Sequence, residues 1–173
     1  MIACEVDTPL GRMMMADGGS GLAGLWFSGQ RHFPNDAAGW PRGRSATLEE
    51  AAQQLDAYFA GRRQAFDLPL ASAGSAFQQS VWQYLQAIPF GQTRSYGEIA
   101  QALGKPAASR AVGMAVGRNP WSLVVPCHRV VGSGGQLTGY AGGLERKRWL
   151  LALETGQEPP SVGVRPARAS RNS

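Results

Sequence analysis

The chain has 173 residues, an ordinary apolar content (43% hydrophobic) and a formal net charge of +5, so it is long enough for one or two small domains with a buried core. Its two cysteines, Cys4 and Cys127, exclude a disulfide framework and a zinc site built from cysteines. No apolar stretch reaches the ~20 residues that cross a bilayer, and the first residues do not resemble a secretory signal. We therefore expect a cytoplasmic protein with no membrane association.

The positive charge is unevenly distributed along the chain. Residues 1–74 carry six basic and eight acidic side chains, a net charge of −2, whereas residues 75–154 carry eight and three, a net charge of +5. Residues 155–173 add three basic side chains and one acidic one. A solvated basic surface explains this distribution, and so does a surface that binds a polyanion, for which nucleic acid is the commonest candidate.

Residues 1–74 have the pattern of a small α/β domain. Apolar segments flank the sequence DGGSG, which predicts a β-hairpin, and a loop rich in Gly, Pro and Arg follows. The sequence TLEEAAQQLDAYFAG then predicts a helix with Thr47 as N-cap, Glu50 in the capping-box position and Gly61 just past the end. The sequence ASAGSA, at residues 71–76, is the best candidate for a linker to a second domain.

The second half of the chain has the pattern of a mostly helical domain. One helix begins at a capping box of Ser75 and Gln78, and another at a capping box of Ser95 and Glu98. After a turn at Gly104, the sequence AASRAVGMAVG predicts a third helix. Two short helices joined by a turn that contains Gly are typical of a helix-turn-helix. An αα-hairpin without a DNA-binding role explains the same spacing at least as well.

Three further segments complete the second half. The apolar run SLVVP is followed by RVVGSGGQLTGY, which predicts a hairpin or wing, and LERKRWLLALE predicts a final helix. The tail at residues 155–173 is rich in Pro, Ser, Gly and Arg, so we expect it to be disordered.

The sequence VVPCHRVV places Cys127 directly beside His128 and Arg129. A thiol becomes a strong nucleophile when it loses its proton, and a nearby imidazole or guanidinium favours the thiolate. Side chains that are adjacent on a strand point to opposite faces, so this chemistry requires a bend at Pro126. It also requires an acid that holds the imidazole in the correct tautomer.

Three acidic residues of the second half are candidates for that acid. Glu98 is already explained as a helix cap, and Glu145 begins a run, ERKR, that looks exposed. Glu154 closes the last helix after the apolar sequence LLAL and is therefore the best orienting acid for His128. A nucleophile that lies shortly after a basic helix-turn-helix suggests chemistry on a DNA base.

The chain from Phe77 to Glu154 closely resembles the O6-alkylguanine-DNA alkyltransferases, also called methylated-DNA–protein-cysteine methyltransferases. The matching blocks are FQQSVW, IPFGQTRSYGEIA, SRAVGMAVGRNP, VVPCHRVVG, LTGYAGGLERK and LLALE. The combination of PCHRV with a later Tyr-x-Gly-Gly motif, after a helix-turn-helix, is highly specific. The first half is similar to the family's N-terminal domain more loosely, through DTPLG, GLAGLWF and LDAYFAG.

The resemblance implies a fold of class α/β + α. A small N-terminal α/β domain that is ribonuclease H-like would span residues 1–74, and a mostly helical, winged helix-turn-helix-like domain for DNA binding and catalysis would span residues 75–154. It also implies direct repair of double-stranded DNA. The alkyl group of O6-alkylguanine, and of O4-alkylthymine, would pass irreversibly to a cysteine in a single turnover.

The family's catalytic residues carry over to five positions of this chain. The resemblance implies that Cys127 accepts the alkyl group, that His128 is its base through a water molecule, and that Glu154 orients His128. Asn119 would hydrogen-bond at the hinge between the recognition helix and the active-site loop, where a simple Asn-Pro helix stop is a compatible alternative. Tyr96 would donate to the guanine ring and help to rotate the nucleotide, and the alternative is a tyrosine of the core.

The resemblance also implies which residues contact DNA and line the base pocket. Arg110 would fill the space that the rotated nucleotide leaves, unless it makes an ordinary phosphate contact. The small residues around it favour close approach to the minor groove, although helix packing would also favour them, and several arginines and Tyr96 would contact phosphates. The expected DNA-binding residues are Arg110, Ala108, Ser109, Gly113, Arg94, Arg118 and Tyr96, and the expected pocket residues are Tyr140, Ala141, Gly142, Val130 and Arg129.

Position 141 departs from some relatives, which carry serine where this chain has Ala141. The missing hydroxyl leaves the range of accepted adducts open but not the reaction. The chain has no ligand set for the metal sites that some relatives hold, so we expect no metal and no cofactor. We expect a monomer in solution, with cooperative assembly on DNA as a further possibility.

Three alternative functions fit parts of the sequence. A damage-sensing alkyltransferase-like protein would keep the fold without the chemistry, but those proteins lack the cysteine that this chain has at Cys127. A helix-turn-helix regulator would bind DNA and not need the thiol. A thiol hydrolase or peroxidase would act on small substrates and ignore DNA.

Overall fold

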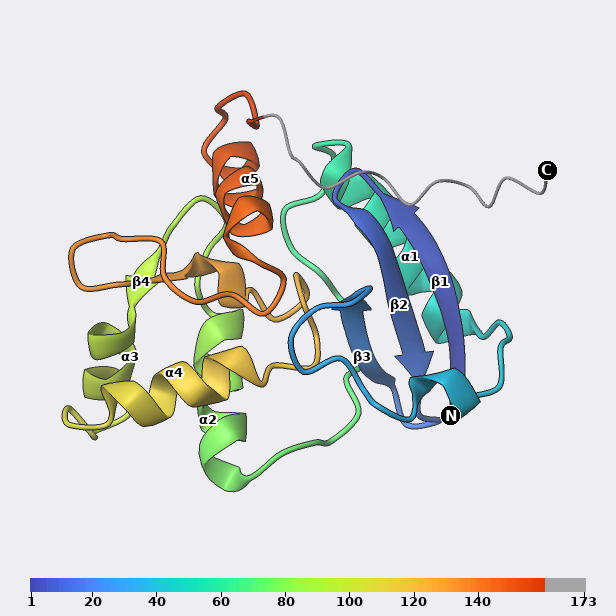
Figure 1. The fold of residues 1–173 in the computed structure, drawn as a ribbon, viewed down its shortest axis with the longest axis horizontal. Helices are drawn as coiled ribbons and strands as arrows, with labels where there is room; N and C mark the ends of the chain where they lie inside the picture. Colours follow the sequence, from blue (N-terminus) through green and yellow to red (C-terminus); the bar gives the residue numbers. More distant parts are fainter. Residues whose placement is uncertain (161–173) are drawn as a thin grey trace. The chain divides into compact units, whose positions relative to one another are not determined.

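The computed structural model describes residues 1–160, which form two compact units. The first unit comprises residues 1–72, and the second comprises the described residues from 73 onward. Figure 1 shows that the strands of the main sheet all belong to the first unit and that most helices belong to the second. The expectation of a disordered tail concerns residues 155–173, and residues 161–173 lie outside the described residues.

The first unit is a three-stranded antiparallel sheet with one helix on it. The sheet has the order β1-β2-β3, with β1 at Ile2–Thr8, β2 at Gly11–Asp17 and β3 at Leu22–Phe27. Helix α1, Ala46–Phe59, packs against β1 and β2 (Figure 1). The hairpin predicted at DGGSG is confirmed as the connection between β2 and β3.

The central strand β2 is covered on both faces. Met13, Met14, Met15 and Ala16 are all buried, although consecutive residues of a strand point to opposite faces. On one side lies a cluster that Met14 and Ala16 form with Trp26 and aromatic side chains of the following loop, Phe33 and Trp40. A short 3-10 helix at Ala37–Gly39 interrupts this loop. The Gly/Pro-rich loop is therefore part of the core of the unit.

Helix α1 begins two residues earlier than the sequence pattern predicts. Its N-cap is Ser45, whose hydroxyl accepts a hydrogen bond from the backbone N–H of Leu48 at 3.2 Å. The prediction of Thr47 as N-cap was wrong because Ser45 has the extended backbone that a cap requires, and Thr47 lies inside the helix. Glu50 instead accepts a hydrogen bond from Gln54.

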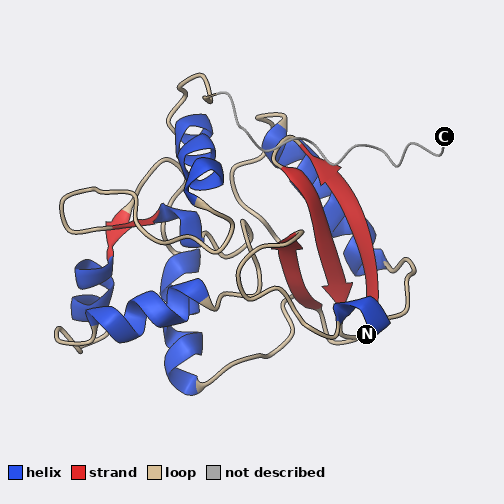
Figure 2. Ribbon diagram, viewed as in Figure 1, coloured by secondary structure: helices blue, strands red, loops and turns tan. Residues whose placement is uncertain are grey.

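The second unit is mostly helical (Figure 2). Both predicted capping boxes are confirmed, at Ser75 with Gln78 and at Ser95 with Glu98. The elements are α2 at Ala76–Gln86, β4 at Arg94–Ser95, α3 at Tyr96–Ala102, α4 at Ser109–Gly117, a 3-10 helix η2 at Cys127–Arg129, β5 at Val130–Val131 and α5 at Leu144–Glu154.

Helices α3 and α4 form the predicted pair of short helices. Gly104 directly follows the C-cap of α3 with a φ of 72°, a left-handed conformation that suits glycine. Helix α4 packs against both α2 and α3. The indole N–H of Trp82, on α2, donates to the carbonyl of Ala115, on α4, at 2.8 Å, and the ring of Trp82 meets Trp121 edge to face. These contacts fix α4 on α2.

The predicted hairpin after residue 129 is wrong in detail. Within residues 129–140, only Val130 and Val131 form a strand, and they pair in parallel with Arg94 and Ser95. The glycine-rich segment that follows is a loop. The N–H of Gly132 donates to the carbonyl of Gln136 and closes this loop. Short parallel pairing between distant segments has no local period, so the sequence pattern could not indicate it.

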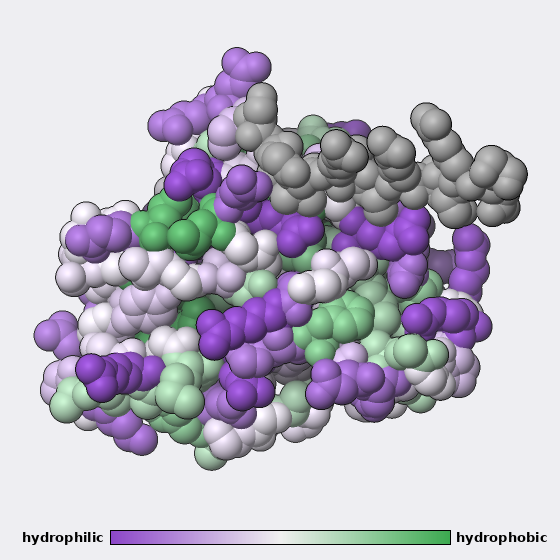
Figure 3. All heavy atoms as spheres, viewed as in Figure 1, coloured by the Kyte–Doolittle hydropathy of each residue, from purple (hydrophilic) through white to green (hydrophobic). Residues whose placement is uncertain are grey.

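Figure 3 shows strongly hydrophilic residues scattered over the viewed face, with smaller apolar patches between them. None of the described helices is long and apolar enough to cross a membrane.

Candidate active site

The segment after α4 folds as consecutive turns that bring Cys127 to the first position of η2. Leu123 has a left-handed backbone with φ of 71°, and the N–H of Cys127 donates to the carbonyl of Val125 at 2.7 Å. Pro126 bends the chain before η2, as the sequence argument required. Because η2 is a 3-10 turn and not a strand, Cys127 and His128 do not alternate between two faces of a sheet.

Asn119 holds this segment to the end of α4. Its side-chain amide donates to the carbonyl of Val125 at 2.8 Å, and its carbonyl oxygen accepts from the N–H of Trp121 at 2.9 Å. The side chain is buried. Asn119 thus fastens the turn directly before Cys127 to the helix that would lie on DNA, which is the hinge position that the resemblance assigns to it.

His128, Glu154 and Arg129 form one buried network. The Nε2 atom of His128 lies 2.7 Å from a carboxylate oxygen of Glu154. Arg129 donates to both oxygens of the same carboxylate, at 2.7 and 2.9 Å, and to the carbonyl of Ile88 at 2.8 Å. The guanidinium also lies over the ring of Phe90. One carboxylate at the end of α5 therefore fixes two consecutive residues of η2.

The charges of this network determine its protonation. Burial alone would raise the pKa of Glu154, but the adjacent His128 and Arg129 hold that pKa well below its usual range, so the group is a carboxylate. Burial lowers the pKa of His128, against the opposing effect of Glu154, so the imidazole is neutral. A carboxylate can only accept, so Nε2 carries the proton and Nδ1 remains a base.

Cys127 is buried, with 4% of its surface exposed. Burial raises the pKa of its thiol, whereas hydrogen bonding from Asn119 and the positive charge of Lys147 lower it. The thiol is thus protonated until a base removes the proton. A substrate can reach a sulfur with so little exposure only by entering the fold.

Two buried polar atoms beside this thiol have no hydrogen-bond partner within residues 1–160. They are Nδ1 of His128 and the hydroxyl of Tyr140. Tyr140 is close enough for negative charge on Cys127 to raise its pKa further, in addition to the larger effect of burial. Buried polar groups are nearly always paired, so unpaired ones around a thiol are typical of a site that receives a ligand.

Residues 76–156 match the family described as "6-O-methylguanine DNA methyltransferase, DNA binding domain", and residues 5–72 match "6-O-methylguanine DNA methyltransferase, ribonuclease-like domain". The chain belongs to the 6-O-methylguanine DNA methyltransferase family. It consists of the family's ribonuclease-like domain followed by its DNA-binding domain, and the α/β + α fold class expected from the sequence is confirmed.

Relatives of this family match nearly the whole chain. A methylated-DNA–protein-cysteine methyltransferase of Mycolicibacterium paratuberculosis is 50% identical over 157 residues, 91% of this chain and 94% of the relative. One from Methanosarcina barkeri is 48% identical over 149 residues, 86% of this chain and 94% of the relative. A crystal structure of the Mycobacterium tuberculosis protein OGT in complex with DNA matches with a TM-score of 0.85 and 46% identity, over 92% of this chain and 96% of that one.

Five of the residues expected to contact DNA lie on α4 or directly beside it. Arg110 and Arg118 are exposed on α4 and just after it, and Ala108 and Ser109 are half-buried at its start. Gly113 lies against another element, since a Cβ there would be 3.8 Å from the ring of Tyr96. A Cβ at this distance makes an ordinary van der Waals contact, so the packing of α4 on α3 does not itself require glycine here.

Two further residues expected to contact DNA, Arg94 and Tyr96, lie at the N-terminal end of α3. Arg94 is half-buried and donates to the carbonyl of Thr93 and to the side chain of Gln92. The hydroxyl of Tyr96 donates to the carbonyl of Thr138 at 3.2 Å. The structure therefore places Tyr96 beside the loop that leads to Tyr140.

The other residues expected to line the pocket differ in how deeply they are buried. Val130 is fully buried in β5, Ala141 is half-buried, and Gly142 is buried with its carbonyl bound by Arg146. The donors of Arg129 are committed to Glu154 and to the carbonyl of Ile88. The sequence pattern could not show this, since it depends on the 3-10 turn at η2.

Lys147 is a buried member of the site that the sequence analysis did not identify. Its ammonium donates to the carbonyls of Val130 and Thr138, at 2.5 and 2.8 Å. The run ERKR looks exposed, but Lys147 lies three residues before Leu150 and seven before Glu154, both of which are buried on α5. That helical spacing was the signal that could have identified Lys147.

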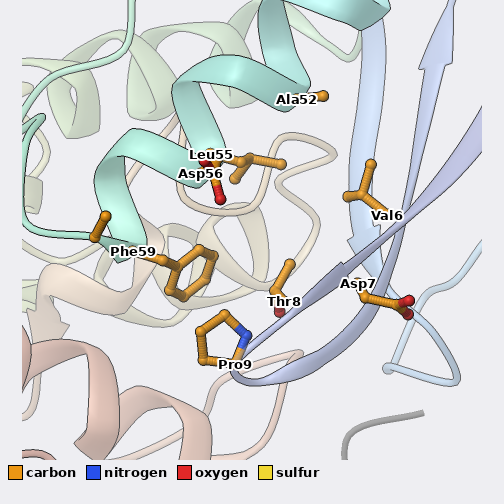
Figure 4. Close-up of a pocket in the computed structure, with 9 residues that line it drawn as sticks. Val6, Asp7, Thr8, Pro9, Ala52, Leu55, Asp56 and Phe59 are labelled. Carbon is orange, nitrogen blue, oxygen red and sulfur yellow. The ribbon is translucent and has the colours of Figure 1, made fainter. Parts of the chain in front are cut away.

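The first unit has a groove of its own, of about 420 Å³, between β1 and α1 (Figure 4). Its polar side chains are Asp7, Thr8 and Asp56, and no Cys or His lines it. The groove offers no nucleophile comparable to Cys127. No group of three or more His, Cys, Asp or Glu that could hold a metal ion occurs in the described part of the chain.

Proposed function

We propose that this chain repairs double-stranded DNA by transferring the alkyl group of O6-alkylguanine, and of O4-alkylthymine, irreversibly to Cys127, once per molecule. The observation that carries the proposal is the thiol of Cys127 beside a neutral His128 whose ring is held by Glu154 at 2.7 Å. Family membership and the DNA complex of the Mycobacterium tuberculosis relative support DNA as the substrate.

The transfer is a single in-line displacement on carbon. His128 takes the proton of Cys127 at Nδ1 through a water molecule, and the sulfur anion attacks the alkyl carbon. The new S–C bond forms as the C–O bond breaks, and its electron pair stays on the base. The protonated imidazole then returns its proton to the guanine. Glu154 stabilises the imidazolium that exists between the two proton transfers, as the acid of a catalytic triad does.

The burial of the thiol requires the nucleotide to leave the helix stack. A base that remains stacked cannot reach a sulfur with 4% exposure, so the damaged nucleotide rotates into the protein, at a cost of roughly a few kcal/mol that is smaller where pairing is already damaged. Tyr96 donates to the carbonyl of Thr138, on the loop that leads to Tyr140, and burial together with negative charge on Cys127 raises the pKa of both tyrosines. We assign Tyr96 to donate to the guanine ring and Tyr140 to line the pocket.

Helix α4 is the element we assign to the minor groove. Arg110 is exposed near its start, and Arg118 is exposed one residue past its end. Between them Met114 is 73% exposed, four residues from each and therefore on the same face of the helix. Arg110 would fill the space left by the rotated nucleotide, while Arg118 and Arg94 would contact phosphates without base specificity.

The proposed reaction ends with the protein consumed. A thioether has no good leaving group, so Cys127 cannot be regenerated by reversal of the same step. The protein acts as a stoichiometric reagent, and no metal or cofactor takes part in any step derived above.

The test is to incubate the protein with an oligonucleotide duplex that carries O6-methylguanine and to weigh its peptides by mass spectrometry. We expect one added methyl group on the Cys127 peptide, none on the Cys4 peptide and none in Cys127→Ser. Folded protein that binds the duplex without gaining a methyl would refute the transfer and favour a damage-sensing or regulatory protein. Turnover of a small thiol substrate that ignores DNA would favour a hydrolase or peroxidase.

A further inference from the structure

The exposed face of α4 carries one large apolar side chain. Met114 is 73% exposed, the highest value among the exposed large hydrophobic side chains of residues 1–160. The buried residues of the same helix are Val112, Ala115 and Val116, and the helix packs on α2 and α3. The side chain of Met114 takes no part in that packing and is open to solvent.

A single exposed hydrophobic residue is common on protein surfaces and needs no explanation by itself. Met114 differs because of where it lies. Arg110 is four residues before it and Arg118 four residues after it, both are exposed, and residues four apart share one face of a helix. Besides Arg110 and Met114, α4 exposes only the small Ala111. The face therefore has an apolar centre between two cationic ends.

The charge around this face indicates what kind of partner covers it. Residues 99–144, which include all of α4, contain no Asp or Glu. A DNA groove matches the pattern, because phosphates line both of its edges and sugars and base edges lie between them. A protein partner would instead need acidic side chains at the spacing of Arg110 and Arg118.

We propose that Met114 contacts the floor of the DNA minor groove and gives the protein a preference for A·T pairs over G·C pairs. The proposal deepens the proposed function and rests on its assignment of α4 to the minor groove. Proteins that bind this groove use apolar side chains against it, methionine among them. The unbranched, flexible side chain of methionine also adapts to irregular surfaces.

The preference follows from the chemistry of the groove floor. A·T pairs present only hydrogen-bond acceptors there, whereas a G·C pair adds the N2 amino group of guanine as a donor. The thioether of Met114 is a weak acceptor, so it covers this amino group without replacing the water that the group loses. Contact with a G·C pair is therefore weaker than contact with an A·T pair.

The first test measures affinity for an undamaged duplex over a range of salt concentrations. Met114→Ala should bind about tenfold more weakly than the wild type at every salt concentration, because burial of apolar surface releases no counterions. Its slope of log K against log salt concentration should equal that of the wild type, whereas Arg118→Ala should reduce the slope by about one. Met114→Leu keeps the apolar side chain and should keep the affinity.

These variants should leave the fold intact, because the position is exposed and Ala, Leu and Met are all good helix formers. The matched control is Ile2→Ala, which removes an exposed apolar side chain from β1 of the first unit and should bind as the wild type does. Wild-type affinity in Met114→Ala, or a reduced salt slope, would overturn the proposal. Loss of self-association in Met114→Ala with unchanged DNA affinity would overturn it in favour of a contact between copies of the chain.

The second test isolates the amino group on the groove floor. Inosine is guanine without the N2 amino group, so an I·C pair presents only acceptors in the minor groove, as an A·T pair does. The wild type should bind an I·C duplex about fivefold more tightly than a G·C duplex of the same purine and pyrimidine order. Met114→Ala should lose most of this difference. A preference that Met114→Ala keeps in full would show that another residue is responsible.

Both tests use undamaged duplexes and need no methyl transfer. A protein that bound them through Met114 without ever gaining a methyl group would contradict the proposed function and leave the contact of Met114 in place. Methyl transfer by the wild type, together with wild-type DNA binding by Met114→Ala, would have the opposite meaning.

Discussion

At the scale of the residue, the site depends on the carboxylate of Glu154. It accepts from His128 and from two nitrogens of Arg129, and all three side chains are buried. Glu154 could be chosen from the sequence because it ends an apolar helix turn. The role of Arg129 could not, because the flanking valines predict a strand, in which neighbouring side chains point to opposite faces, whereas the structure has a 3-10 turn.

Replacement of Glu154 should strongly destabilise the fold. In Glu154→Gln the guanidinium of Arg129 remains buried without its counter-charge, and breaking such a pair costs roughly 3–5 kcal/mol of unfolding free energy. Urea denaturation measures this difference. The matched control is Glu145→Gln, an exposed acid on the same helix, which should change stability by about 0.5 kcal/mol or less. Equal losses in the two variants would contradict the network.

The same carboxylate gives a prediction for pH. The pKa of Glu154 is lower in the folded chain than in the unfolded chain, where it is about 4.3. Its stabilising contribution is therefore present above about pH 4.3 and is lost as the pH falls below that value. Urea denaturation in that acid range should show a steeper loss of stability for the wild type than for Glu154→Gln. Identical slopes would show that the carboxylate is not held ionised by its neighbours.

At the scale of the element, local patterns predicted the helices better than the strands. The capping boxes at Ser75 and Ser95 were correct because a hydroxyl and a Gln or Glu three residues later satisfy two backbone donors in a local pattern. At the start of α1 both Ser45 and Thr47 have a hydroxyl that could cap the helix, and the structure has Ser45 as the N-cap. The pairing of β4 with β5 joins segments far apart in the sequence and leaves no local pattern.

Helix α4 provides the prediction at this scale. Arg110→Ala should slow transfer from duplex DNA at least about tenfold, equivalent to ~1.4 kcal/mol, while transfer from a free O6-alkylguanine base changes little, because the free base needs no rotation out of a stack. Single-turnover rates on the two substrates measure this. Arg118→Ala, which removes an exposed arginine just after the same helix, is the control and should affect only duplex binding. Equal losses on both substrates for Arg110→Ala would exclude its proposed role in the stack.

At the scale of the whole molecule, charge and chemistry coincide. Residues 75–154 carry the net charge of +5 and also contain Cys127, His128 and Glu154, whereas residues 1–74 carry −2. This coincidence was visible in the sequence. The burial of Lys147 was not, because a lysine in a run of charged residues looks exposed until its helical face is known.

This charge distribution predicts steep salt dependence of DNA binding. Each neutralised phosphate adds about −0.9 to the slope of log K against log salt concentration, because counterions are released. Fluorescence anisotropy with an undamaged duplex should therefore show affinity that falls sharply as salt increases, and Arg118→Ala should reduce the slope by about one. Salt-independent binding would mean that the basic residues of the second unit do not contact the backbone.

The most direct test of the central claim is a titration of the protein with an excess of duplex that carries isotope-labelled O6-methylguanine. The chemistry at Cys127 predicts rapid transfer that stops at one methyl group per protein molecule, all of it on that sulfur, with unmodified guanine left in the DNA. Continued turnover beyond that stoichiometry, or label on any other residue, would contradict it.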